Sequence, residues 1–173
     1  MKKTIIILLL TIVFLISPNS LKADTFLNQV PKKVNYQLPY PGVLPDNPIY
    51  FFKNIRDKIL LFITEKGRDK ADRLLLYSDK KISMSRELMK KGKVKLSLKT
   101  AISAEEDFNK LITEIQDNQI TDPEFTSKVK LSSDKHKEVI IQLITDSQLP
   151  ETNDLVKTLL KLTEKNLQEV TKI

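Results

Sequence analysis

Apolar residues recur every three or four positions along most of the chain, a spacing that places them on one face of an α-helix. The first such stretch runs from about residue 48 to residue 66, with apolar positions Ile49, Phe52, Ile55, Ile59 and Phe62, widened by Leu60, Leu61 and Ile63. So broad an apolar surface predicts a helix that is buried on more than one side. Pro48 suits the first helical position, and Asp46 or Asn47 can cap it.

Four further stretches show the same spacing, at about residues 70–91, 94–118, 122–148 and 151–173. They are separated by residues suited to turns and caps, namely Gly67, Asp69, Gly92, Thr121 or Asp122 with Pro123, and Leu149-Pro150. Long helices joined by short connections favour antiparallel neighbours. The sequence therefore predicts an all-α fold, an up-and-down bundle of about five helices that occupies residues 48–173.

The N-terminus has the pattern of a signal peptide over residues 1–23. Lys2 and Lys3 precede an apolar run at residues 4–17, and Ala23 suits the cleavage position. The run is about 14 residues, whereas a membrane-spanning helix needs roughly 20. We therefore expect an exported protein, periplasmic or extracellular, that is not integral to the membrane after cleavage; an uncleaved N-terminal anchor is the alternative.

Residues 24–47 show no sustained period and contain several prolines. Proline disfavours helix and favours extended, polyproline-like backbone. This segment is predicted to be an extended, proline-rich arm that precedes the bundle. Its apolar residues, Tyr36, Leu38, Tyr40, Val43 and Leu44, indicate that it lies on the bundle.

Charge and composition narrow the possible functions. Three lysines and no acid precede the predicted cut, so the formal charge of +7 becomes +4 in the mature chain. Such a modest excess favours anionic surfaces weakly and does not indicate nucleic acid as a partner. The chain has no cysteine, which excludes disulfides, thiolate metal sites and a lipidated N-terminal cysteine.

Recognisable enzyme motifs are missing from the sequence. Three glycines do not form a phosphate-binding loop, and one histidine cannot form an HExxH pair. The Glu-x-x-His unit of di-iron bundles is also absent, because residue 133 is Ser. We therefore predict no catalytic, cofactor-binding or metal site, and a protein that is not an enzyme.

A set of polar residues interrupts the apolar stripes of three predicted helices at about the same height along the bundle. If a hairpin turns near residue 120, Glu105 and His136 lie at the same height, and Ser78 lies within about a turn of it. The three side chains are predicted to form a buried polar layer. A hydrogen bond that fixes helix register is the favoured interpretation; a metal- or ligand-sensing site with a proton-sensitive histidine is the alternative.

Three other groups have weaker functional interpretations. A basic run around Gly92, formed by Lys90, Lys91, Lys93, Lys95 and Lys99, suits anionic lipid or wall polymers, or is a solvated bundle end. The cluster Glu105-Glu106-Asp107 suits acid–base or cation chemistry, although Glu106 and Asp107 are expected to face solvent beside Lys110. An aromatic set could line a groove or hold the arm down, namely Tyr36, Tyr40, Tyr50, Phe51 and Phe52.

The segment after the arm carries a motif of the form Leu-Pro-x-x-Pro-x-Tyr-Phe-x-Lys, made here by Leu44, Pro45, Pro48, Tyr50, Phe51 and Lys53. With the helices that follow, to about residue 115, it resembles an uncharacterised family of bacterial extracytoplasmic helical domains. The resemblance implies export and an all-helical fold but supplies no active site.

Taken together, the sequence predicts a non-enzymatic binding or scaffold module of the bacterial cell envelope. Its expected partners are envelope proteins or anionic envelope surfaces, and its oligomeric state is left open. The alternative is a sensing bundle that uses Glu105 and His136.

Overall fold

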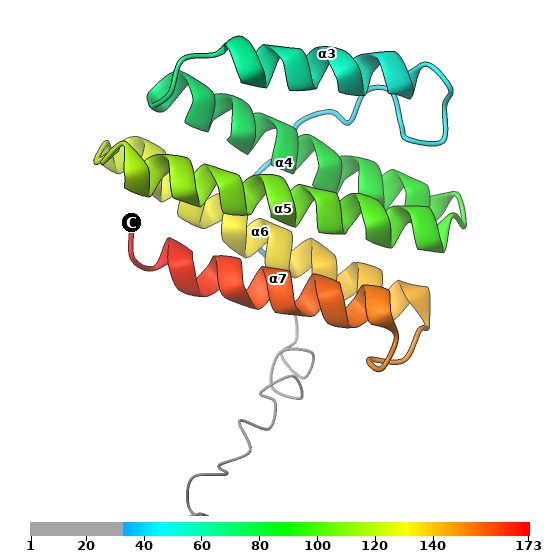
Figure 1. The fold of residues 1–173 in the computed structure, drawn as a ribbon. Helices are drawn as coiled ribbons and strands as arrows, with labels where there is room; N and C mark the ends of the chain where they lie inside the picture. The colour runs from blue at the N-terminus through cyan, green and yellow to red at the C-terminus, as the bar shows by residue number, and fades with distance from the viewer. Residues whose placement is uncertain (1–32) are drawn as a thin grey trace, which may run out of the picture. The chain divides into compact units, whose positions relative to one another are not determined.

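The computed structural model describes residues 33–173, which form a bundle of helices (Figure 1). The predicted signal peptide at residues 1–23 and the first part of the arm, residues 24–32, lie outside the described residues. Within the described part, the chain forms five helices and no strand, so the all-α prediction is confirmed. The helices are α3 (Tyr50–Ile63), α4 (Arg68–Lys90), α5 (Val94–Asp117), α6 (Pro123–Ser147) and α7 (Asp154–Val170).

Helices α4 to α7 form a four-helix bundle, and α3 lies outside it against α4 (Figure 1). Consecutive helices run in opposite directions, as expected from their short connections. The contacts, however, place α4 beside α5 and α6, and α7 beside α5 and α6. The α5–α6 connection therefore crosses the bundle diagonally, and α5 and α6 make fewer contacts than the hairpin expected from the sequence would give.

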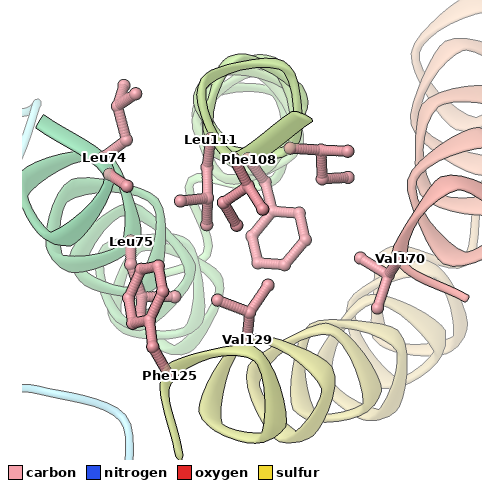
Figure 2. Close-up of a cluster of buried hydrophobic side chains, with 10 residues drawn as sticks. Leu74, Leu75, Phe108, Leu111, Phe125, Val129 and Val170 are labelled. Atoms are coloured by element: carbon pink, nitrogen blue, oxygen red, sulfur yellow. The ribbon is translucent and has the colours of Figure 1, made fainter. Parts of the chain in front are cut away.

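The core lies between these four helices and contains side chains from all of them (Figure 2). Phe108 on α5 and Phe125 on α6 are among its largest fully buried side chains, and Leu75 and Val129 pack with them. Full burial of a large apolar side chain stabilises a fold by about 1.5–3 kcal/mol. Because the chain has no cysteine, this packing replaces any disulfide as the source of stability.

Helix starts agree with the sequence where a side chain caps them. Asp122 Oδ1 accepts hydrogen bonds from the backbone N–H groups of Glu124 and Phe125, at 3.0 and 3.4 Å, and Pro123 opens α6. Asn153 caps α7, and the helix itself begins at Asp154, three residues after the expected start. In both helices the capping oxygen accepts from N–H groups of the first turn, which have no partner within the helix.

The start of α4 differs from the prediction that Asp69 caps it. Asp69 lies in the first turn, and the capping position is Gly67, whose φ of +101° suits glycine. The Gly67 N–H donates to Oε1 of Glu114 on α5, at 2.6 Å. A side chain from a neighbouring helix therefore holds this turn, which the local sequence cannot indicate.

Helix α3 has the opposite orientation to the one predicted. Its apolar stripe is exposed to solvent, with Phe52 and Phe62 among its most exposed side chains. Its inner face carries Tyr50, Lys53 and Asp57, which turn toward α4 and α5 around a polar cleft. The prediction that the stripe is buried is wrong, because the face of α3 that meets the bundle carries charged side chains that line this cleft, with Leu61 as its apolar contact to the core.

The described part of the arm, residues 33–47, forms no helix or strand and is hydrogen-bonded to the bundle. Ser83 Oγ donates to the carbonyl oxygen of Pro39 at 2.7 Å, and the Val34 N–H donates to Oε2 of Glu138 at 2.6 Å. These bonds confirm that the arm lies on the bundle. Among residues 33–173, none of the helices is both long and apolar enough to cross a membrane.

Candidate functional site

The most unusual feature of the interior is a histidine held between two carboxylates from different helices. His136 lies on α6 and is 1 % exposed. Its Nδ1 atom lies 2.8 Å from Oε1 of Glu105 on α5, and its Nε2 atom lies 3.0 Å from Oδ1 of Asp79 on α4. The ring of Phe108 covers it, with ring centroids 5.0 Å apart. One imidazole thus joins three helices inside an apolar core.

Glu105 is the branch of this network that reaches α7. Asn166 on α7 donates from Nδ2 to Oε2 of Glu105 at 2.8 Å and to its carbonyl oxygen at 2.9 Å. Asn109 in turn donates to Oδ1 of Asn166 at 3.2 Å. The polar layer therefore includes a member from each of the four bundle helices.

Asp79 is the branch that reaches the arm. Ser132 Oγ donates to Oδ1 of Asp79 at 2.6 Å, and the Tyr36 hydroxyl donates to Oδ2 at 2.5 Å. Within residues 33–173, every buried side-chain nitrogen and oxygen has a hydrogen-bond partner. The network is therefore closed, with no unused group left for a ligand to satisfy.

The two carboxylates determine the charge of the histidine. Burial disfavours a charged ring, but the hydrogen bonds and charges of Asp79 and Glu105 outweigh it and raise the pKa of His136 to about 9. At neutral pH the ring is therefore an imidazolium that donates from both nitrogens. Burial and the neighbouring Asp79 charge also raise the pKa of Tyr36 well above its usual value, so the phenol stays protonated.

This arrangement suits structure better than catalysis or metal binding. An imidazolium with both N–H groups engaged has no lone pair with which to accept a proton or bind a metal. Within the described range, no cluster of three or more His, Cys, Asp or Glu side chains could hold a metal ion. What the network can do is fix the register of four helices and respond to pH.

The sequence identified part of this network. The predicted contact between Glu105 and His136 is confirmed. Ser78 was expected as the third member, but its hydroxyl donates to the carbonyl oxygen of Leu75 in its own helix, at 2.9 Å. Asp79, the next residue, takes that place. Its position between Leu75 and Ile82 at helical spacing was the available signal, since it interrupts a buried face as Glu105 does.

A second polar site is the cleft of about 300 Å³ between α3, α4 and α5. On the α3 side, Lys53 Nζ lies 2.8 Å from Oδ2 of Asp57, and Arg56 reaches Oδ1 of the same carboxylate at 2.7 Å. Partial burial of Asp57 opposes ionisation, but Lys53 and Arg56 hold the pKa of its carboxyl below the usual value. The charge of Asp57 on the inner face of α3 is thus balanced by side chains of the same helix.

The opposite wall of the cleft carries Asp107 on α5. Its Oδ2 atom lies 2.5 Å from Lys81 Nζ, and its Oδ1 atom lies 2.9 Å from Lys110 Nζ. Asp107 was expected to face solvent and is in fact buried, whereas Glu106 is exposed as predicted. The acidic cluster at residues 105–107 therefore divides between the core, the cleft and the solvent, and does not form one site.

The basic run and the aromatic set are also divided by the fold. Lys91 and Lys93 lie 3.1 and 2.9 Å from Oδ2 of Asp46, so part of the basic run binds the arm. The aromatic side chains do not share a groove: the Tyr36 hydroxyl binds Asp79, Tyr50 lines the cleft, and the exposed members are Tyr40, Phe51 and Phe52.

Comparison with known proteins gives one result. No curated protein and no solved structure matches the chain. A family model does match, over residues 42–173, which include the end of the arm and all five helices. The match extends beyond the resemblance seen in the sequence, which ended near residue 115. The chain therefore belongs to the family described as a domain of unknown function, DUF5667.

Proposed function

We propose that this chain is an exported, non-enzymatic binding or scaffold module of the bacterial cell envelope. The observation that carries this proposal is the orientation of α3, whose apolar face is exposed while its polar face packs inward. A large exposed apolar face is uncommon on a monomeric soluble protein and marks a surface that another molecule covers. The exposed face of α3 is therefore the surface that we expect to bind a partner.

The interior of the bundle also supports a binding module, because its polar network is closed. Its most polar group, around His136, is sealed from solvent and fully hydrogen-bonded. Substrate binding or metal exchange there would require the bundle to open, and the imidazolium offers no free lone pair. The network therefore serves to hold the module in one conformation, and the sensing role considered for Glu105 and His136 is the less favoured candidate.

The envelope location rests on the sequence of residues 1–23. A basic start, a short apolar run and a small residue at the expected cut are typical of export signals. The absence of cysteine is compatible with export, since the packed core does not need a disulfide. The partners proposed are an envelope protein or an anionic envelope surface.

Cell fractionation combined with cross-linking in living cells tests this function. The full chain would carry a photoreactive amino acid at Phe62 on α3 or, as a matched control, at Leu131, an exposed apolar residue on α6. We expect the chain in the envelope fraction, its loss from that fraction when residues 4–17 are deleted, and cross-links from position 62 only. Recovery of the full chain in the cytoplasm, or equal cross-linking from both positions, would overturn the proposal.

A further inference from the structure

We propose that the apolar face of α3 binds the surface of an anionic lipid bilayer, with the helix lying parallel to the membrane. This inference rests on the proposed function, because it names the partner of the envelope module. It follows from the composition of the face, the charges at its border and the polar character of the opposite face.

The face is continuous and consists of long apolar side chains. Its members are between 41 % and 90 % exposed, and they are Phe51, Phe52, Ile55, Ile59, Phe62 and Ile63. At 3.6 residues per turn these positions occupy about a third of the helix circumference over the whole length of α3. Aromatic and branched aliphatic side chains on one face of a surface helix are the composition that inserts between lipid headgroups and acyl chains.

The border of this face is basic. At helical spacing, Arg56 lies on one edge of the stripe and Lys58 on the other, and both are exposed. Just past the C-terminal end of the helix, Lys66 is also exposed, next to Glu65. Cations at these positions complement anionic headgroups.

The acidic side chain of α3 is kept away from the face. Asp57 is the single carboxylate within Tyr50–Ile63, and it is buried on the inner side, paired with Lys53 and Arg56. A protein partner for a basic-edged stripe would need an acidic rim of matching shape, whereas a second copy of α3 would bring like charges together. An anionic bilayer accepts the apolar side chains among its acyl chains and the basic side chains at its headgroups, and it requires no surface of matching shape.

The experiment uses the absence of tryptophan from the chain. Phe62→Trp, at the most exposed position of the face, introduces a single tryptophan without disturbing the core, and Leu131→Trp on α6 is its matched control. The full chain is mixed with vesicles of phosphatidylcholine with or without phosphatidylglycerol, some carrying brominated acyl chains. Because the readout is local, binding through residues 4–17 does not imitate it.

We expect a blue shift and bromine quenching for Phe62→Trp with phosphatidylglycerol vesicles, and neither change for Leu131→Trp. Reversing the border charges in the Phe62→Trp background, with Lys58→Glu and Lys66→Glu, is expected to weaken partitioning by at least about tenfold. Equal quenching at positions 62 and 131, or no response at position 62, would overturn the inference. A blue shift that depends on protein concentration without vesicles would also overturn it, in favour of self-association.

The two proposals can fail separately. If position 62 does not respond to vesicles but still cross-links to an envelope protein in cells, the bilayer is the wrong partner and the envelope module stands. If the full chain is cytoplasmic or cross-links equally from positions 62 and 131, the envelope module itself is wrong.

Discussion

Nδ1 of His136 and Oε1 of Glu105 lie 2.8 Å apart although α5 and α6 face each other across the diagonal of the bundle. The imidazolium therefore occupies the centre of the four-helix arrangement, with Asp79 on its other side. The proton that charges this ring is stabilised by carboxylates on two other helices. The stability of the whole domain is consequently linked to that proton.

Folding stability is predicted to fall as the pH rises from about 6.5 to about 9. The pKa of His136 is raised in the folded state to about 9 from its ordinary 6.5. A raised pKa stabilises the folded state fully below the unfolded value and loses this effect as pH passes the folded value. The contribution lost is on the order of 3 kcal/mol. Urea unfolding at several pH values between 5.5 and 9.5 measures it.

The matched control is His136→Gln, which retains hydrogen bonding and cannot titrate in this range. Other groups also titrate near pH 9, so the informative quantity is the difference between the two proteins at each pH. That difference should shrink as the pH rises. A difference that is constant from pH 5.5 to 9.5 would show that folding does not shift the pKa of His136.

Asp79→Ala is predicted to destabilise the fold by about 3–5 kcal/mol, because it breaks a buried ion pair and leaves the Nε2–H group of His136 without an acceptor. The variant also removes the acceptor for Ser132 and Tyr36. Asp72→Ala, on the same helix, breaks an exposed ion pair with Arg68 and should cost less than about 1 kcal/mol. Chemical denaturation compares the two, and similar losses would contradict a central role for the buried network.

Tyr36→Phe is predicted to loosen the arm and to destabilise the fold by about 1.5–3 kcal/mol, since it removes a hydrogen bond to a charged group. Faster proteolysis within residues 33–47 should accompany the loss. Tyr40→Phe removes a hydroxyl from a largely exposed ring and should change neither quantity. An arm that is cleaved at equal rates in both variants would mean that the Tyr36–Asp79 bond does not hold it.

Backbone substitutions at two helix ends are predicted to act in opposite directions. Gly67→Ala should destabilise by about 1–2 kcal/mol, because φ is +101° there, although open space surrounds the position of the new methyl group. Gln148 caps α6 with φ of +55°, so Gln148→Gly should be neutral or stabilising by up to about 1 kcal/mol. Thermal unfolding measures both, and a stabilising Gly67→Ala would refute the assignment of strain.

The helices were predictable from the sequence because each carries a regular apolar stripe and ends at a recognisable residue. Gly92 and Pro123, for example, lie where the sequence places them, and Glu105 and His136 stand out as polar residues within apolar stripes. Asp79 was missed because the stripe was traced through Ser78, one position away. A small residue fits a buried face by itself, whereas a carboxylate does so only when partners arrive from other helices.

The orientation of α3 could not be predicted in the same way. A helical stripe shows that two faces differ but not which face meets the rest of the molecule. That choice depended on Lys53 and Asp57 finding a charged cleft completed by Lys81 and Asp107 on other helices. Pairing between side chains of different helices cannot be read from the spacing of apolar residues within one helix.

The hydrogen bonds of Tyr36 and Asn166 make the polar network depend on the arm and the last helix together. One residue lies in the arm and the other on the last helix, and both bind the carboxylates that hold His136. A chain clipped in the arm, or one without its last helix, loses a hydrogen bond to one of these two interior carboxylates. Loss of either segment is therefore expected to lower the stability of the whole bundle, because the carboxylates it contacts join the other helices through His136.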